Sequence, residues 1–154
     1  MDTSALLALL YDDDYADESE AALRAAYRDG RLVVTPVVYA ELAADGGFGD
    51  ASDLDTFLSD FSIRLETPSR AAAFRAGESF REYLNRRPDG LECPACGTER
   101  SVSCPACGES LAPRQHVAAD LLIGGHAAVD ADALVTFDAG FYGTYFPELP
   151  VRPE

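Results

Sequence analysis

Short apolar runs alternate with helical patterns along this chain, and the alternation is the strongest constraint on its fold. The apolar runs have the length of short buried strands, and they lie at residues 32–34, 62–65, 133–136 and 149–152. The helical patterns lie at residues 3–10, 18–28, 36–45, 52–60, 69–84 and 113–129. Strands separated by helices form a parallel sheet with helices on both faces. The sequence therefore predicts an α/β domain.

The size and hydrophobic content fit one globular domain over residues 1–154. A chain of 154 residues buries a single sizeable core, and a hydrophobic fraction of 47% excludes wholesale disorder. No apolar run approaches the roughly 20 residues that span a membrane, and the first residues lack the pattern of a signal peptide. We therefore expect a cytoplasmic protein that does not associate with a membrane.

The composition is strongly acidic, with a formal net charge of −15, and all 12 basic residues are arginine. The absence of lysine suggests a salty cytoplasm of the haloarchaeal type, where salt screens the self-repulsion of an acidic surface. This charge counts against a broad basic groove for nucleic acid, although such a groove binds weakly at high salt in any case. Phosphate contacts would depend on a bound metal and a few arginines. The candidates are Arg70, Arg75, Arg81 and Arg114.

Four acids stand in four recognisable local settings. They are Asp2 in Asp-Thr-Ser-Ala-Leu-Leu, Glu41 in Thr-Pro-Val-Val-Tyr-Ala-Glu-Leu, Asp120 in His-Val-Ala-Ala-Asp-Leu-Leu-Ile and Asp138 in Leu-Val-Thr-Phe-Asp. No two of them are close in the sequence, so only the fold can bring them together. Carboxylates gathered in space form an oxygen cage for Mg²⁺ or Mn²⁺, and such sites hydrolyse phosphodiesters.

The order of these motifs resembles that of the PIN-domain nucleases. A DTS opening, a PxxxAEL helix start, a helical AxDxLI and a strand-ending VTxD follow one another, and within the family the chain looks most like the VapC-type toxin ribonucleases. The resemblance covers nearly the whole chain except about residues 85–111. It implies a PIN-like three-layer fold with a central parallel sheet flanked by helices. It also implies Mg²⁺- or Mn²⁺-dependent endoribonuclease activity, with all four acids as metal ligands.

The first two acids also have ordinary structural interpretations. Asp2 could be a helix N-cap, a role that Asp and Ser fill well, but the expected position at the carboxyl end of a strand favours a metal ligand. Ser4 could contact a metal-bound water or a phosphate, although capping is the simpler interpretation. Glu41 lies on the second turn of a helix that Thr35 caps, where an exposed glutamate would be unremarkable. The resemblance places the second acid of the site there.

Asp120 is expected in the middle of a helix among apolar residues, where a lone charge is expensive to bury. It therefore needs a partner such as a metal ion. Gly124 lies one turn further on, and we expect the small side chains at Gly124 and Ala127 to leave room for a metal or a scissile phosphate. His116 lies one turn before Asp120 and could contact the substrate or assist proton transfer, although a histidine in this position more often bonds a nearby polar group.

Asp138 follows the strand at 133–136, so its carboxylate can join Asp2 at one edge of the sheet. We expect Thr136 to support the site by hydrogen bonding. Relatives often carry a further acid two residues after this one, in a TxDxDF pattern, whereas this chain has Gly140 followed by Phe141. The fourth acid is therefore less firmly assigned than the other three.

Four cysteines form a CxxC-x7-CxxC array, namely Cys93, Cys96, Cys104 and Cys107. In each CPxCG half the glycine, Gly97 or Gly108, permits a tight turn that aims backbone amides at sulfur. In a reducing cytoplasm this spacing favours zinc over disulfides. Four sulfur ligands leave no open position for water, so the zinc would be structural. We predict a zinc ribbon inserted at residues 89–110.

The beginning of the chain does not fit this fold. In the resembled family the residues before the first acid form the central strand of the sheet, whereas only Met1 precedes Asp2 here. A missing central strand would leave backbone groups on its neighbours unpaired. Either the strand is reduced to a stub or the true start lies upstream of Met1, and we expect the second.

The resemblance implies an RNA substrate, a homodimer and an antitoxin that silences the enzyme by covering its acidic cleft. Two other classes of function stay open. The chain could be a PIN endonuclease that processes ribosomal or transfer RNA without an antitoxin, with the ribbon gripping structured RNA. It could instead be a catalytically silent PIN scaffold that binds a partner through the ribbon. A neighbouring antitoxin gene would favour the toxin, and metal-dependent RNA cleavage would exclude the scaffold.

Overall fold

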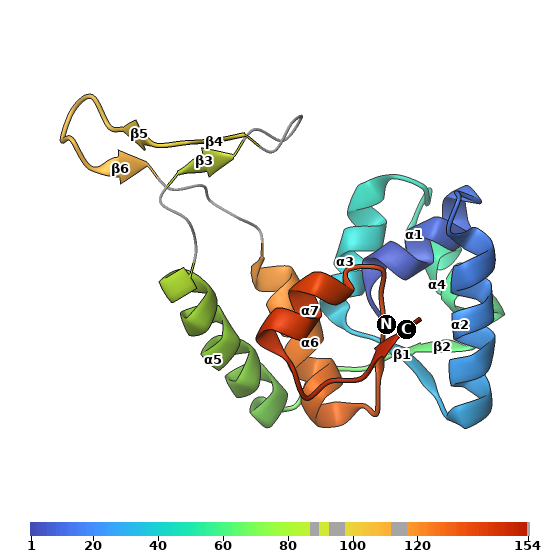
Figure 1. Cartoon of the computed structure of the whole chain (residues 1–154). Coiled ribbons are helices and arrows are strands. Elements are labelled where there is room, and N and C mark those ends of the chain that lie inside the picture. The colour runs from blue at the N-terminus through green and yellow to red at the C-terminus, as the bar shows by residue number, and fades with distance from the viewer. Residues whose placement is uncertain (87–89, 93–97, 112–116, 154) are drawn as a thin grey trace.

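The computed structural model describes residues 1–86, 90–92, 98–111 and 117–153. Figure 1 shows a body of helices around short strands. The elements before the cysteine-rich segment are α1 (Thr3–Tyr11), α2 (Ala16–Asp29), β1 (Leu32–Val34), α3 (Pro36–Asp45), α4 (Ala51–Asp60), β2 (Ile63–Leu65) and α5 (Arg70–Arg86). Those after it are α6 (Ala118–Asp130), β7 (Leu134–Val135), α7 (Ala139–Tyr145) and β8 (Val151–Arg152). No helix in these described ranges is long and apolar enough to cross a membrane.

Helix α3 begins and ends where the sequence predicts. The Thr35 hydroxyl accepts a hydrogen bond from the amide of Val38 at 3.4 Å, and Pro36 occupies the first turn. The helix stops at Gly46, whose φ of 87° lies in the left-handed region that glycine adopts without a steric cost. Val38 and Leu42 on its inner face are fully buried. The packing of this face determines where the side chain of Glu41 lies relative to the core.

The sheet consists of two parallel strand pairs bridged by the first two residues. Strand β1 pairs with β2, and β7 pairs with β8, both in parallel. The Met1 amino group donates to the carbonyl of Val33 at 2.8 Å, and the Asp2 amide donates to the carbonyl of Val135 at 2.9 Å. The predicted parallel sheet is therefore present as two halves joined by this short stretch, which lies in the central position.

A cavity of about 150 Å³ opens beside Met1, between the two strand pairs. Its walls include Val33 of β1, Val135 of β7, and Ile123 and His126 of α6. Burial lowers the pKa of the Met1 amino group to about 6. The cavity is therefore flanked by backbone that could pair with a further strand. It also contains the Met1 amino group, whose protonated form is destabilised by burial.

Adding three apolar, β-branched residues before Met1 is expected to raise the melting temperature by several degrees. The added backbone can pair with β1 and β7, and its side chains can fill the cavity. The gain should be larger at pH 6 than at pH 8. As the pH falls from 8 to 6, the amine of the unfolded chain becomes protonated before the buried Met1 amine does, so the fold loses stability over this range. The extension converts the Met1 amine into a peptide amide, which does not titrate, and so removes this loss. Thermal melting at both pH values measures the effect. An equally long asparagine extension is the control, and equal melting temperatures for the two would contradict the strand pairing.

Helices α5 and α6 pack very closely because glycines remove side chains from their contact. A Cβ atom on Gly125 would lie 2.6 Å from the carbonyl oxygen of Ala72 in α5. A Cβ atom on Gly124 would lie 2.3 Å from the ring of Phe146. The expectation that Gly124 leaves room for a metal or phosphate is therefore wrong, because the Phe146 ring already fills that space.

Two features at the second half of the chain differ from the prediction. Helix α6 begins at Ala118 and not at residue 113, so Asp120 lies in its first turn and not in its middle. Residues 112–116 lie outside the described part of the chain. Helix α7 was not predicted, and it begins where Asp138 caps the chain by accepting a hydrogen bond from the amide of Phe141 at 3.1 Å.

The cysteine-rich segment forms two short antiparallel pairs. Strand β3 (Leu91–Glu92) pairs with β4 (Glu99–Arg100), and β5 (Val102–Ser103) pairs with β6 (Ser110–Leu111). Figure 1 shows both pairs standing apart from the helical body. The four strands lie between α5 and α6 in the chain, and the zinc ribbon at residues 89–110 stays a prediction.

Candidate active site

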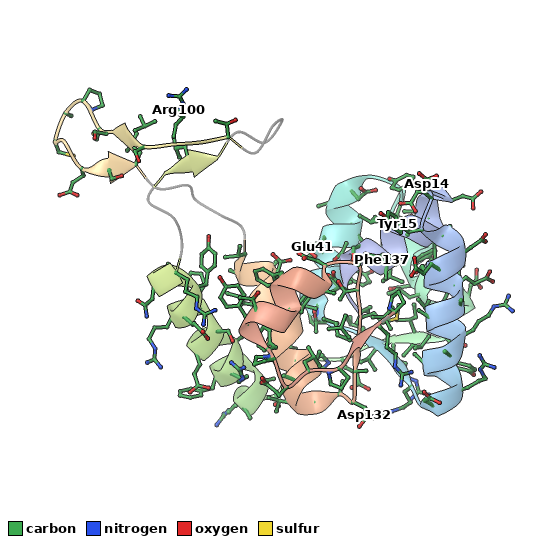
Figure 2. All side chains as sticks on the ribbon, viewed as in Figure 1. Asp14, Tyr15, Glu41, Arg100, Asp132 and Phe137 are labelled. Carbon is green, nitrogen blue, oxygen red and sulfur yellow. The ribbon has the colours of Figure 1, made fainter. Side chains whose placement is uncertain are left out.

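The four predicted acids come from four different elements and face one region. Asp2 precedes α1, Glu41 lies on α3, Asp120 lies in the first turn of α6 and Asp138 precedes α7. Asp138 follows β7, and the Asp2 amide donates to the carbonyl of Val135 at the carboxyl end of the same strand, where α/β sheets bind ligands. In Figure 2 Glu41 and Phe137, the neighbour of Asp138, are labelled close together in the upper half of the body, while Asp132 is labelled at its lower end.

Asp2 is held by hydrogen bonds on both carboxylate oxygens. Oδ1 accepts from the amide of Thr3 at 2.8 Å, so Asp2 is also the N-cap of α1. Oδ2 accepts from the hydroxyls of Ser4 at 2.9 Å and Thr136 at 2.6 Å. Asp2 is 6% exposed, and this set of donors compensates the burial of its charge. Ser4 therefore orients Asp2 through its side chain and does not cap the helix itself.

Glu41 is half-buried and is oriented by a residue that the sequence analysis did not select. The Thr3 hydroxyl donates a hydrogen bond to Oε2 of Glu41, which joins the start of α1 to the second turn of α3. Thr3 follows the first acid directly, and its neighbour Ser4 contacts Asp2 from the same turn. The short hydroxyl side chains after the first acid were the signal that could have identified it.

Asp120 carries the most perturbed carboxyl of the site. Burial, together with the negative charges of Asp2, Glu41 and Asp138, raises its pKa to about 6. All three partners act on it at once, so the four carboxylates share one electrostatic environment although they are far apart in the sequence. Like charges collected in this way repel one another unless a cation or a proton is present.

Asp138 is exposed and links the site to α7. Its amide donates to the hydroxyl of Thr136 at 3.0 Å, and the same hydroxyl donates to Asp2. One oxygen of its side chain caps α7, which leaves the other available to a ligand. Thr136 thus connects the first and the fourth acid, in the supporting position that its place in the sequence suggests.

The donor set fits a hard divalent cation that retains much of its water. All four side chains offer carboxylate oxygens, the ligands that Mg²⁺ and Mn²⁺ prefer. In the described part of the chain, no three His, Cys, Asp or Glu side chains are close enough to one another to hold an ion by themselves. Mg²⁺ is usually bound through one or two carboxylates and several waters, so the arrangement does not need three direct ligands. The buried hydroxyl of Tyr142 lies near these acids and has no hydrogen-bond partner among the described residues.

Of the arginines and the histidine proposed as auxiliary groups, Arg75 has contacts with other residues. Arg75 is engaged elsewhere, since it pairs with Glu148 at 2.8 Å and lies 4.8 Å from the centre of the Phe146 ring. It is therefore not available to a phosphate. Arg70 and Arg81 are exposed on α5. Arg114 and His116 lie outside the described residues.

The second cysteine pair lies in a tight turn. The amides of Ala106 and Cys107 point at the sulfur of Cys104 and, with the thiol of Cys107, lower its pKa. The Gly108 amide donates to the carbonyl of Cys104 at 2.8 Å, and Gly108 has a φ of 79°. Both thiols are free. The zinc ribbon stays a prediction, and Cys93, Cys96 and Gly97 lie outside the described residues.

Comparisons with known proteins agree with this architecture. The family model for the PIN domain matches residues 1–88, which include Asp2 and Glu41 but end before Asp120 and Asp138. The crystal structure of VapBC2 from Rickettsia felis, bound to a DNA fragment from its promoter, has a chain with the same fold. The two chains are 17% identical with a TM-score of 0.61, over 97% of this chain and 93% of that one. No curated protein gives a significant match.

Proposed function

This chain belongs to the PIN domain family, and from that premise we propose that it is a divalent-metal-dependent endoribonuclease of the VapC toxin type. PIN domains are generally nucleases, so hydrolysis of a phosphodiester is the expected reaction. The observation that carries the proposal is the convergence of three carboxylates, those of Asp2, Glu41 and Asp138, on Asp120, whose pKa is raised by burial and by their charges. A group of charges that destabilises itself in this way is typical of a functional site.

In the proposed mechanism the four carboxylates hold the cation, and neighbouring hydroxyls orient the carboxylates. The cation would be held by Asp2, Glu41, Asp120 and Asp138. When bound, Mg²⁺ or Mn²⁺ lowers the pKa of a water molecule and stabilises negative charge on the leaving oxygen. Thr3 orients Glu41, while Ser4 and Thr136 orient Asp2. Attack of water on phosphorus with release of the 3′ oxygen gives 5′-phosphate and 3′-hydroxyl ends.

RNA binding in this proposal relies on aromatic stacking more than on positive charge. The rings of Tyr15 and Phe137 lie 5.0 Å apart, and Phe137 is the residue between Thr136 and Asp138. Tyr15 is 54% exposed, so a nucleobase beside the scissile phosphate has a flat surface on which to stack. Stacking of neutral rings does not depend on counterion release, which suits a chain with a net charge of −15.

Two protein partners follow from the toxin assignment, namely an antitoxin and a second copy of the chain. The antitoxin is proposed by analogy with the VapBC2 complex, and it would cover the acidic site. Large apolar side chains remain available for such contacts, including Tyr11 at 55%, Tyr27 at 56% and Phe74 at 71% exposure. The physiological compartment in this proposal is the cytoplasm, where the RNA substrate is found.

A structural zinc ion is proposed for the cysteine-rich segment. The turn at Cys104–Cys107 supports it, because amides aimed at a sulfur stabilise the thiolate that binds zinc. Cys93 and Cys96 would supply the remaining ligands, and a site filled by four sulfurs has no position for water. The ribbon would therefore brace or extend the nuclease without taking part in catalysis.

The purified protein is expected to cleave single-stranded RNA when Mn²⁺ or Mg²⁺ is present and to stop when EDTA is added. Products should carry 5′-phosphate and 3′-hydroxyl ends, because the 3′ oxygen is the leaving group. RNA ligase identifies these ends, since it joins a 5′-phosphate and does not join a cyclic phosphate. A 2′-deoxy oligonucleotide at the cleaved position should also be cut, since the 2′-hydroxyl is not the nucleophile. Cleavage that persists in EDTA would contradict the mechanism, and no cleavage with either metal would contradict the activity.

A further inference from the structure

Tyr142 places a buried hydroxyl next to the acidic site. It lies on α7, one helical turn after Asp138, and its backbone amide donates to the carbonyl of Asp138 at 3.3 Å. The side chain is 1% exposed, and its ring packs edge-on against Phe141 with 5.4 Å between centroids. Among the residues that the structure describes, no group forms a hydrogen bond of acceptable geometry with its phenol oxygen.

The surroundings of this hydroxyl are carboxylates. Burial, then the charges of Asp2, Asp120 and Asp138, raise the pKa of the Tyr142 phenol. The phenol therefore stays neutral and can act as a donor. Asp2 lies near enough to interact with the O–H, yet the contact lacks good hydrogen-bond geometry. A tyrosine in the core normally finds a partner for its hydroxyl, and a core that needs the ring alone is served equally well by phenylalanine.

Two acids of the site, Asp2 and Asp120, differ in their hydrogen bonds. Three of the roughly four lone pairs on the Asp2 carboxylate are occupied, by the Thr3 amide and the hydroxyls of Ser4 and Thr136. Asp120 is half-buried and receives no hydrogen bond from another side chain in the described part of the molecule. A buried hydroxyl without a hydrogen-bond partner among the described residues thus lies close to Asp2, in the same acidic site as Asp120.

We propose that Tyr142 is a positioning residue of the acidic site, whose buried O–H is the neutral donor that holds the carboxylates of Asp2 and Asp120 in place for a divalent cation. Such a donor reduces repulsion between two like charges without competing for the cation, which a lysine or arginine would do. Groups that orient metal ligands in this way commonly change metal affinity about 10–100-fold when they are removed. The inference rests on the proposed function for the identity of the site.

The test is the variant Tyr142→Phe, which keeps the ring and removes the hydroxyl. Calorimetric titration with Mn²⁺ is expected to show affinity weakened about 10–100-fold. Cleavage at low Mn²⁺ should fall by a similar factor, and it should recover to near the wild-type rate at saturating Mn²⁺. The melting temperature without metal should not fall, because the hydroxyl makes no hydrogen bond to a described residue in that state. Tyr145→Phe is the matched control on the same helix and should retain wild-type affinity.

The possible outcomes separate this inference from the proposed function. Mn²⁺ affinity within about twofold of wild type would overturn the role of Tyr142, whatever the RNA assay shows. A lower melting temperature with unchanged affinity would assign the hydroxyl to the core and would also overturn it. If the wild-type protein cleaves RNA and Asp120→Asn does not, the proposed function stands in either of these cases. If the wild-type protein binds no Mn²⁺, the proposed function and this inference fail together.

Discussion

Replacing Asp120 by asparagine is expected to lower Mn²⁺-dependent RNA cleavage by at least about 100-fold while leaving the fold intact. The amide keeps the shape of the side chain but removes a charge from the cation site, and groups that stabilise charge in a transition state are typically worth about 10²–10³ in rate. Initial rates on a short single-stranded RNA, with saturating Mn²⁺, measure the effect. Undiminished cleavage by the purified variant would contradict the role of Asp120.

The same variant should be at least as stable as the wild type without metal. Burial and three neighbouring charges raise the pKa of Asp120 to about 6 in the folded protein, against 3.8 as the ordinary value. The folded protein therefore binds this proton more tightly than the unfolded chain, so the wild type loses stability as the pH rises from about 4 to 6. The substituted asparagine side chain does not titrate, and the difference in melting temperature should open over that range and stay constant above it.

The size of this difference is limited because Asp120 is half-buried. Solvent screens part of the repulsion, so the difference in free energy of unfolding at neutral pH should be about 1 kcal/mol. For a chain of this length this corresponds to a difference in melting temperature of roughly 2–4 °C. Asp132→Asn is the matched control, because Asp132 is an exposed acid at the opposite end of the body in Figure 2. It should change neither cleavage nor the pH dependence. An Asp120→Asn protein that is less stable than wild type at pH 8 would show that the carboxylates do not strain the metal-free fold.

Replacing Cys104 by serine is expected to release one zinc ion per chain and to unfold the segment from about residue 91 to 108. A four-thiolate site commonly contributes roughly 10–16 kcal/mol of apparent binding free energy to the folding of its module. A module of about twenty residues has too small a core to fold without it. Elemental analysis measures the zinc, and amide hydrogen exchange reports which backbone amides of the β3–β6 strands lose protection. Ser103→Ala, on the exposed strand beside Cys104, is the control that should retain both.

The helical body should survive the loss of the ribbon. Helices α5 and α6 pack directly on each other through Gly125 and Ala72, independently of the segment that joins them. Cleavage of a short unstructured RNA should therefore remain near the wild-type rate in Cys104→Ser. Protein purified under reducing conditions without zinc would contradict the assignment of the cysteines. Loss of cleavage on the short RNA would contradict a purely structural role.

The elements with strong local signals were predictable from the sequence. Thr35 followed by Pro36 determines where α3 begins, and Gly46 determines where it ends, because capping and the left-handed conformation depend on the residues themselves. The strand at Leu32–Val34 was located correctly for the same reason, as its short apolar run is bounded by a turn and a cap. Predictions of this kind need no knowledge of the rest of the fold.

Features that depend on tertiary contacts could not be predicted. Helix α7 contains Gly140 and Gly143, which lower its intrinsic helix propensity, and its stability comes from aromatic packing such as that of Tyr142 and Phe146. The capping role of Asp138 was a local signal for this helix that the strand-ending pattern obscured. The pairing of Met1 and Asp2 with two separate strands likewise depends on residues more than thirty positions away.

The candidate site shows the same division. The order of the four motifs selected the acids, but it did not show that Thr3 orients Glu41 or that the Tyr142 hydroxyl lies beside them, because these contacts join distant elements. Gly124 was misinterpreted for a related reason. A small residue near a charged one can make room for a ligand or for another side chain, and here the Phe146 ring fills the space.

The location of a bound Mn²⁺ ion tests the central claim most directly. Crystals grown with Mn²⁺ give an anomalous signal that is strong above the manganese absorption edge and nearly absent below it. The account predicts a peak bounded by the carboxylates of Asp2, Asp120 and Asp138, within reach of Glu41, and no such peak in crystals of Asp120→Asn. The account would be contradicted if crystals grown at a Mn²⁺ concentration that supports cleavage showed the peak elsewhere or showed no peak.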